Sequence, residues 1–192
     1  MKQQTVLYTL LLFCFFSCTS RQKGSRGADQ YEKGITIVDG KVQSISSYHE
    51  QDATIFYLVR HAEKEKGEDP GLTSEGTLRA EKLAKILEPT QLSAIYSTNL
   101  KRTINTASPS AGLKNLEINS YDARQQSELV ESLISRKGEQ FLIVGHSNSI
   151  PGLLNLFQKK KVYKDIRESE FDNIYIVMAN SKDDCKVIEL KF

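Results

Sequence analysis

Residues 54–64, TIFYLVRHAEK, decide the fold of this chain. Five consecutive apolar residues, 55–59, are rich in β-branched and aromatic side chains and predict a strand buried on both faces, as in a parallel sheet. Charged residues follow at once, beginning with Arg60 and His61. Open α/β sheets bind their ligands just past the carboxyl ends of the strands. We therefore expect a binding site at the end of this strand.

The pair Arg60 and His61 combines two chemistries. A guanidinium group binds phosphate or carboxylate oxygens with two parallel hydrogen bonds, and an imidazole serves as nucleophile, acid, base or metal ligand. For an isolated pair the ordinary interpretation is simpler: Arg60 forms a surface ion pair with Glu63, and His61 ends the strand. The rest of the chain has to decide between these interpretations.

Length and charge restrict the class of protein. The chain has 192 residues, which suits one well-filled domain, and its net charge is +2, from 26 basic and 24 acidic residues. This balance gives no sign of a nucleic-acid-binding surface, so no nucleic-acid partner is expected.

The first 18 residues predict export. Lys2 precedes an almost wholly apolar run at 6–16, which is short for a membrane span and has the proportions of a secretory signal. Ser17 before Cys18 resembles a bacterial lipoprotein signal, which would leave Cys18 as a lipidated first residue on a membrane-anchored protein of the cell envelope. Cys14 is the competing position, and a plain cleaved signal or a retained anchor is the alternative.

The remaining N-terminal sequence predicts a tether and a hairpin. We expect a signal segment at 1–18, a flexible polar tether at 19–33 and one domain at 34–192. Two alternating runs around Asp39-Gly40, within 35–45, predict a hairpin at the edge of the main sheet, with His49 in an exposed loop beyond it. Cys185 is then left as a free thiol without a disulfide partner.

Alternating strand and helix patterns fill the rest of the chain. After the first strand, Thr73 or Ser74 caps a helix whose apolar positions begin at Leu78 and which Pro89 ends, and Ser97-Thr98-Asn99 caps a helix that carries Arg102 in its early part. Further strands are expected at 92–96, 116–119, 141–144, 174–178 and 187–192, and further helices at 125–136 and from about 150. This order predicts a three-layer α/β/α sandwich with a mostly parallel central sheet.

Similar chemistry follows three of the predicted strands. Arg60-His61 follows the first, Ser97 with Arg102 the second, and Gly145-His146-Ser147 a third. A doubly wound sheet brings such strand ends together, so two histidines and two arginines are expected to share one pocket.

The motifs resemble those of the histidine phosphatase superfamily, also called the phosphoglycerate mutase-like family. The resemblance covers about 55–156 and keeps the motifs in order: LVRHAE at 58–63, Leu72-Thr73 with Gly76, YS at 96–97 with Arg102 and TA at 106–107, and VGHS at 144–147. Ala62 stands where the best-known members have Gly, although an RHAE-containing branch also has Ala at this position. Asn105 stands where Gln is usual.

The resemblance implies a histidine acid phosphatase-like phosphoric monoester hydrolase that works through a phosphohistidine. His61 would be the nucleophile, and Arg60, Arg102, His146 and Ser147 would bind the phosphate. Independently of the family, two guanidinium groups and an imidazole can stabilise the charge on a transferred phosphoryl group without a metal or cofactor. The partner expected is a small phosphorylated substrate.

The proton donor for the leaving alcohol stays open between two carboxylates. Asp122 follows a tyrosine in a loop before a helix, as in the RHAE-containing branch, although a helix N-cap is an equal alternative. Glu63 stands beside the nucleophile but could instead pair with an arginine and hold it in place.

Three other functions compete with hydrolysis. One is an inactive module that binds phosphate, the second is mutase-type phosphotransfer, and the third is a metal site on the three histidines, which lack the spacing of a compact metal motif. The physiological substrate and the oligomeric state do not follow from the sequence.

Overall fold

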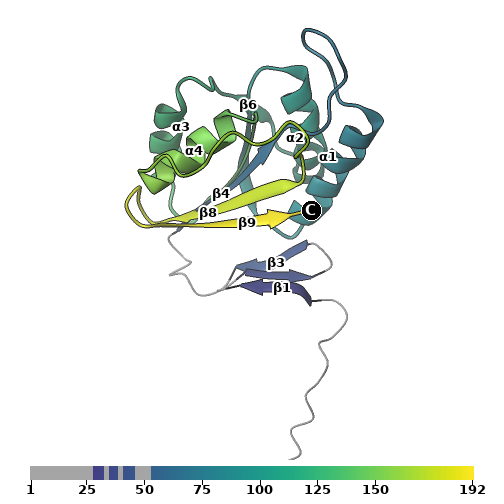
Figure 1. Ribbon diagram of the computed structural model, residues 1–192. Helices are drawn as coiled ribbons and strands as arrows, with labels where there is room; N and C mark the ends of the chain where they lie inside the picture. Colours follow the sequence, from purple (N-terminus) through teal and green to yellow (C-terminus); the bar gives the residue numbers. More distant parts are fainter. Residues whose placement is uncertain (1–27, 33–34, 39–40, 46–52) are drawn as a thin grey trace, which may run out of the picture.

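A six-stranded mixed sheet forms the centre of the domain (Figure 1). The computed structural model describes residues 28–32, 35–38, 41–45 and 53–192. The strand order is β6-β5-β7-β4-β8-β9. The strands of this sheet are β4 (Thr54–Arg60), β5 (Leu92–Ser97), β6 (Ile118–Ser120), β7 (Gln140–Gly145), β8 (Asn173–Ala179) and β9 (Cys185–Lys191).

Strand β4 lies inside the sheet, as its apolar run predicts. It pairs parallel with β7 and antiparallel with β8, and all seven of its residues are buried. β5 pairs parallel with both β6 and β7, whereas β8 and β9 form an antiparallel hairpin. The expected mostly parallel sheet is confirmed, with its antiparallel part at the β9 edge.

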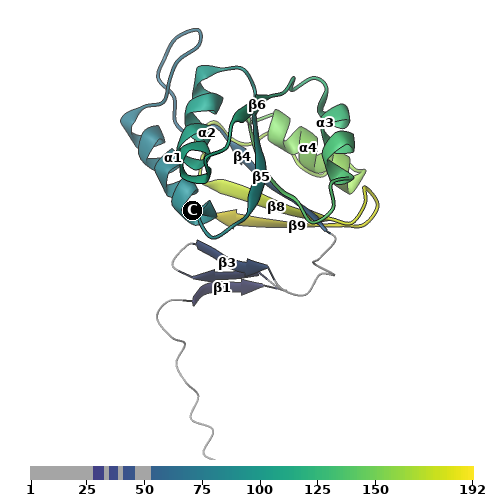
Figure 2. The same cartoon turned by 180° about the vertical axis from the view of Figure 1, so that it is seen from behind.

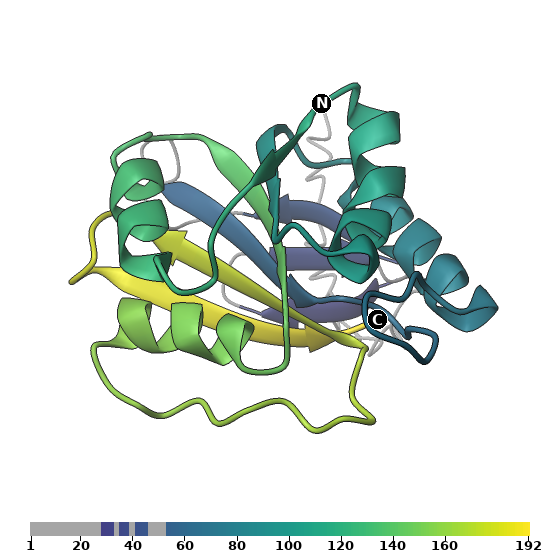
Figure 3. The same cartoon turned by 90° about the horizontal axis from the view of Figure 1, so that it is seen from above.

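Four helices cover the two faces of the sheet (Figures 2 and 3). Tyr57 and Val59 of β4 contribute to one buried cluster, which α1 and α2 complete, and Phe56 and Leu58 contribute to the other, which α3 and α4 complete. This alternation follows from the two-residue period of a strand. The helices are α1 (Ser74–Leu87), α2 (Lys101–Lys114), α3 (Gln126–Ile134) and α4 (Ser149–Gln158). The three-layer α/β/α prediction is confirmed.

Two details of the helices differ from the prediction. Thr73 caps α1 as expected, accepting a hydrogen bond from the Gly76 backbone N–H at 3.0 Å, but Leu78 is 66% exposed and is no core residue. Leu83 and Leu87 cover the sheet instead, and Leu78 lies on the opposite side of the helix. The N-cap of α2 is Leu100, which forms no side-chain cap, rather than Ser97-Thr98-Asn99.

The N-terminal strands form a sheet of their own. β1 (Ala28–Glu32), β2 (Ile35–Val38) and β3 (Lys41–Ile45) are antiparallel in the order β1-β2-β3. β2 and β3 pair as the predicted hairpin, but this hairpin does not join the edge of the main sheet. β1 also falls within 19–33, where a flexible tether is expected, so part of that range is a strand.

Several N-terminal predictions lie outside the described residues. These are the signal segment with Cys14 and Cys18, the Asp39-Gly40 turn and His49. Within the described ranges, no helix is both long enough and apolar enough to cross a membrane. Cys185 is a free thiol whose Sγ donates to the backbone carbonyl of Phe157.

Candidate active site

The ends of β4, β5 and β7 bring the two histidines and two arginines together. The His61 backbone N–H donates to the carbonyl of Gly145 at 2.9 Å, which ties the end of β4 to the end of β7. The His61 and His146 rings lie with their centroids 5.6 Å apart, edge to face. Arg60 and Arg102 lie close enough that their charges lower the pKa of both imidazoles.

His61 is buried and uncharged. Its Nδ1 lies 2.8 Å from the backbone carbonyl oxygen of Ala62, which can only accept, so Nδ1 carries the proton and the lone pair is on Nε2. Burial is the main reason that the pKa of His61 is lowered to about 4. The nearby cations Arg60 and Arg102 lower this pKa further, whereas the hydrogen bond to Ala62 raises it. A neutral imidazole with a fixed tautomer is the form that a nucleophile requires.

Ala62, which stands where the best-known members of the family that the motifs resemble have Gly, is accommodated inside the protein. Its side chain is buried, and its backbone N–H donates to Thr106 Oγ1 at 2.9 Å. Thr106 in turn donates to the carbonyl of Arg102 at 2.7 Å. This chain of hydrogen bonds joins the segment after β4 to α2 and so fixes the relative position of His61 and Arg102.

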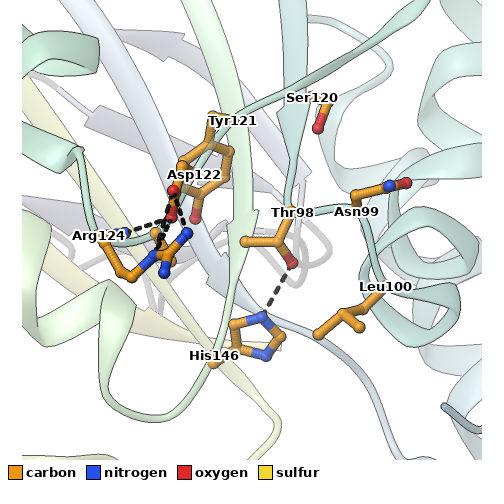
Figure 4. Close-up of a pocket in the computed structure, with 9 residues that line it drawn as sticks. Thr98, Asn99, Leu100, Ser120, Tyr121, Asp122, Arg124 and His146 are labelled. Carbon is orange, nitrogen blue, oxygen red and sulfur yellow. Dashed lines mark hydrogen bonds and ion pairs between the residues drawn. The ribbon is translucent and has the colours of Figure 1, made fainter.

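Buried Thr98, which Thr103 contacts in turn, hydrogen-bonds to His146; Figure 4 draws the bond between Thr98 and His146. Thr98 Oγ1 lies 2.9 Å from both His146 Nε2 and Thr103 Oγ1. The Thr103 hydroxyl is also in reach of two backbone carbonyls, those of Thr98 and Leu100. If Thr103 uses its single proton on a carbonyl, Thr98 donates to Thr103 and accepts from His146 Nε2–H, which leaves Nδ1 of His146 unprotonated. Burial, with Arg102 and Arg60 nearby, lowers the pKa of His146 to about 4.

The Arg60 guanidinium turns toward the segment before β8. Its Nη1 donates to the carbonyls of Arg167, Glu168 and Glu170 at 2.7, 3.3 and 3.1 Å, and its Nη2 pairs with the Glu168 carboxylate at 3.0 Å. The Phe171 ring stacks 4.2 Å from the guanidinium carbon. The Nε–H of Arg60 is buried and without a partner among the described residues, and Nη2 carries a second N–H besides the one on Glu168. A phosphate contact by Arg60 would therefore use Nε or this second Nη2–H.

Arg102 presents a second unpaired N–H. It lies in the first turn of α2, and its Nη1 is 3.9 Å from Asp69, whose Oδ1 also accepts from the Lys101 backbone N–H at 3.0 Å. Its Nε is buried and, like that of Arg60, has no partner in the described part of the chain. A buried unsatisfied donor costs about 1–3 kcal/mol. An oxyanion would satisfy both arginines.

Glu63, one of the two candidate proton donors, is bound to an arginine. Glu63 forms a bidentate pair with Arg79 of α1, with Nε at 2.8 and 2.9 Å and Nη2 at 2.6 Å. Burial raises the pKa of Glu63, but hydrogen bonds from Arg79 and the charge of Arg60 outweigh it, and the net pKa is lowered. Glu63 thus pairs with an arginine and holds it in place, which was the alternative to a role as proton donor. Because its pKa is lowered, Glu63 is a poor proton donor.

Asp122 lines a cavity of about 490 Å³ that His146 also lines (Figure 4). Its carboxylate accepts from Arg124 Nε at 3.1 and 3.2 Å, from Nη2 at 2.9 Å and from the Arg124 backbone N–H at 2.9 Å. These hydrogen bonds and the Arg124 charge hold the pKa of Asp122 below its usual value. Asp122 does not cap a helix, because α3 begins at Gln126 with Gln125 as its N-cap.

Ser147 has a backbone role in the structure. Its carbonyl accepts from the Ile166 backbone N–H at 2.9 Å, which fastens the loop after β7 to the segment before β8. No group of three or more His, Cys, Asp or Glu side chains within the described ranges could hold a metal ion.

Several contacts of the site are absent from the sequence prediction. The sequence predicted Thr98 only as part of a helix cap. Arg79 lies one helical turn after Glu75, and no sequence pattern indicates that Glu63 is its partner. Phe171 and Arg124 lie in connecting segments without a motif, where residue type alone does not indicate a site.

Part of the chain matches a known protein family. Residues 56–123 match the family model of the Histidine phosphatase superfamily (branch 1). The chain is 36% identical over 99 residues to Phosphoserine phosphatase 1 of Hydrogenobacter thermophilus, a match that covers 44% of this chain and 47% of the relative. The chain thus spans about half the length of this curated relative.

Solved structures share the fold. One is a putative alpha-ribazole-5'-P phosphatase from Escherichia coli, with a TM-score of 0.60 and 13% identity over 73% of this chain and 97% of that one. Another is phosphoglycerate mutase from Bacillus anthracis, with a TM-score of 0.59 and 12% identity over 73% of this chain and 94% of that one. The chain therefore has the mixed α/β fold of phosphoglycerate mutase-like histidine phosphatases.

Proposed function

We propose that this protein is a metal-independent phosphomonoester hydrolase that works through a phosphohistidine on His61. The observation that carries the proposal is the buried, neutral His61, whose Nε2 lone pair lies beside two arginines that each have a buried, unpartnered Nε–H. A phosphoryl group provides the electrophile for the Nε2 lone pair of His61 and the oxyanion for the two arginine N–H groups. The superfamily match over 56–123 supports the same reaction class.

The first step transfers the phosphoryl group to the enzyme. The Nε2 lone pair of His61 forms a bond to phosphorus while the phosphorus–oxygen bond to the leaving group breaks and its electron pair stays on that oxygen. Asp122, in the cavity that His146 also lines, supplies the proton to this oxygen. Arg102 and Arg60 Nε stabilise the equatorial oxygens, and His146, held by Thr98, donates to them only after the charge of the bound phosphoryl group has drawn a proton onto its Nδ1.

The second step returns the enzyme to its starting state. A water oxygen attacks phosphorus, the phosphorus–nitrogen bond breaks, and its electron pair returns to Nε2. The Asp122 carboxylate takes a proton from the attacking water, which restores the acid. The products are the alcohol and inorganic phosphate.

A panel assay tests this proposal. Phosphate release from chemically diverse phosphomonoesters is measured in the presence of EDTA for the wild type, for His61→Ala and for Lys82→Gln as an exposed control on α1. We expect EDTA-resistant hydrolysis that Lys82→Gln keeps and His61→Ala abolishes. Hydrolysis that survives in His61→Ala contradicts the nucleophile assignment, and loss of activity with EDTA contradicts the metal-independent chemistry.

Mutase activity is the second candidate, because the fold is shared with a phosphoglycerate mutase. The two reactions differ in the acceptor of the phosphoryl group. If an added alcohol or phosphoglycerate takes up the phosphoryl group faster than water does, the protein is a mutase. We expect water to be the preferred acceptor.

We also propose that the protein is exported and anchored by a lipid on Cys18. The support is the sequence of the first 18 residues, a basic start followed by an apolar run and Ser17-Cys18. Metabolic labelling with a radioactive fatty acid in a bacterial host tests this. We expect label in the wild type and none in Cys18→Ser, and equal labelling of both contradicts it.

A further inference from the structure

The segment between α4 and β8, residues 159–172, places an aromatic ring beside His61. It runs back along α4 to the start of β8 (Figures 1 and 3), and Phe171 lies just before that strand. The centroid of the Phe171 ring lies 4.2 Å from the guanidinium carbon of Arg60 and 6.1 Å from the ring centroid of His61. One uncharged, half-buried side chain therefore lies against two members of the site.

Contacts on both sides of Phe171 hold its backbone in place. Before it in the chain, Ile166 is buried, and its backbone N–H donates to the carbonyl of Ser147 at 2.9 Å. After it, the carbonyl of Asp172 accepts from the backbone N–H of Phe192 at 2.8 Å. The segment is thus fastened to the loop after β7 and to the end of β9, so the fold itself sets the position of the ring.

The ring completes an enclosure of the Arg60 guanidinium. Backbone carbonyls of the same segment accept from Nη1, and the Glu168 carboxylate accepts from Nη2 at 3.0 Å. These hydrogen bonds hold the edge of the planar guanidinium, while the Phe171 ring covers one of its faces. The group is thereby held in one orientation, in which Nε–H is buried and has no partner among the described residues.

The same ring contributes to the burial of His61. Burial is the largest cause of the lowered pKa of His61. Three charged or titratable groups also lower this pKa, and they come from three different elements: Arg60, Arg102 and His146. The two carboxylates beside Phe171 in the chain are paired elsewhere, Glu170 with Arg167 and Asp172 with Lys191. Because Phe171 is uncharged, replacing it changes the access of water to His61 without changing these charges.

We propose that Phe171 is a positioning residue of the site: its ring holds the Arg60 guanidinium ready for the phosphoryl group and keeps water from His61, so that the imidazole meets the substrate as a free base. Phe171 takes no part in the bonds that form and break, and it acts only through Arg60 and His61. The effect on turnover rests on the proposed phosphatase function, whereas the shielding of His61 is a property of the free protein.

Three substitutions separate the two effects of the ring. Phe171→Tyr keeps the aromatic face, Phe171→Leu keeps only the apolar bulk, and Phe171→Ala removes both. Tyr163→Leu is the matched control, because it also removes a half-buried ring from this segment, but that ring packs against Tyr175 with centroids 6.1 Å apart.

Two measurements are made on each variant. The titration of His61 is followed without substrate by NMR of its imidazole Cε1–H, which is assigned by its absence from the spectrum of His61→Gln. Values of kcat and KM are measured with p-nitrophenyl phosphate at about pH 7.5 and about pH 5, on either side of the region where an ordinary imidazole titrates. Urea unfolding checks that every variant is folded at both pH values.

The titration should respond to the loss of apolar bulk. Phe171→Ala should raise the midpoint of His61 by about one pH unit, toward the value of about 6.5 for an exposed imidazole. Phe171→Leu, Phe171→Tyr and Tyr163→Leu should keep the midpoint of the wild type. The ratio of kcat/KM at about pH 7.5 to that at about pH 5 should then rise about twofold in Phe171→Ala alone, because about half of His61 is protonated at the lower pH.

Turnover at about pH 7.5 should respond to the loss of the aromatic face. Phe171→Leu and Phe171→Ala should lower kcat/KM by about threefold to thirtyfold, the scale of one cation–π contact. Phe171→Tyr should keep most of the activity, because its ring can stack on Arg60 in the same way, and Tyr163→Leu should keep all of it.

Contrary results separate this proposal from the phosphatase function. A wild-type midpoint of His61 in Phe171→Ala refutes the shielding, and wild-type kcat/KM in Phe171→Leu refutes the hold on Arg60. Equal losses in Tyr163→Leu overturn the assignment to Phe171, and all three results leave the phosphatase function standing. If the wild type releases no phosphate from p-nitrophenyl phosphate or from any ester of the panel, the phosphatase function fails and the effect on turnover falls with it, while the NMR titration still decides the shielding of His61.

Discussion

The lowered pKa of His61 predicts how the stability of the protein depends on pH. The pKa of His61 is about 4 in the folded protein, against about 6.5 for an unperturbed imidazole in the unfolded chain. Between these values the unfolded chain binds a proton that the folded protein does not. The free energy of unfolding is therefore highest above about pH 6.5 and falls as the pH is lowered toward about 4.

The size of the effect follows from the same two pKa values. A tenfold change in proton affinity is worth about 1.4 kcal/mol, so lowering the pH from about 7.5 to about 5 costs about 2 kcal/mol through His61. His146 acts in the same direction, because its pKa is also lowered to about 4. Its share is smaller, since it is less buried and solvent screens it more.

Urea unfolding followed by circular dichroism measures this dependence. In His61→Gln the loss of unfolding free energy between about pH 7.5 and about pH 5 should be about 2 kcal/mol smaller than in the wild type, because glutamine does not titrate. Asp122→Asn, which removes a carboxylate whose pKa lies below its usual value and which therefore does not titrate in this range, is the control and should keep the slope that His61 causes. Equal slopes in the wild type and His61→Gln would refute the assignment of a buried, neutral His61.

Three substitutions test other parts of the site. Arg102→Ala removes a proposed oxyanion donor and should lower kcat/KM about a hundredfold, or about 3 kcal/mol of barrier, whereas a loss below about threefold places Arg102 outside the phosphate site. Thr98→Val removes the hydrogen bond to His146, so the pH profile of kcat should shift and Thr98→Ser should restore it; an unchanged profile in Thr98→Val argues against this positioning role. Gly76→Ala should lower the free energy of unfolding measured in urea by about 1–3 kcal/mol, because a Cβ at Gly76 would collide with the carbonyl oxygen of Glu63; a wild-type free energy of unfolding contradicts this close approach.

The sequence could predict the features that depend on local pattern and sheet topology. β4 followed from one apolar run, and the meeting of His61 with His146 followed from the rule that parallel strand ends share an edge. The cap of α1 at Thr73 followed from a short local signal.

What the sequence could not predict depends on tertiary contacts between distant segments. Arg60 finds carbonyl partners more than a hundred residues away, on a segment without regular structure, so no periodicity marks the contact. Thr98 has the residue type of a helix cap, but the presence of His146 and Thr103 makes it a hydrogen-bond bridge instead. Leu78 follows a helical spacing loosely and turns out to face solvent.

The phosphoenzyme is the most direct test of the central claim. The protein is mixed with a substrate that it hydrolyses, quenched with alkali within one turnover, digested and analysed by mass spectrometry. We predict a phosphoryl group on the imidazole of His61, stable in alkali and lost in acid, at a level that rises when the second step is slowed. Turnover with a phosphoryl group on another residue, or with no phosphoenzyme at any quench time, would contradict the account.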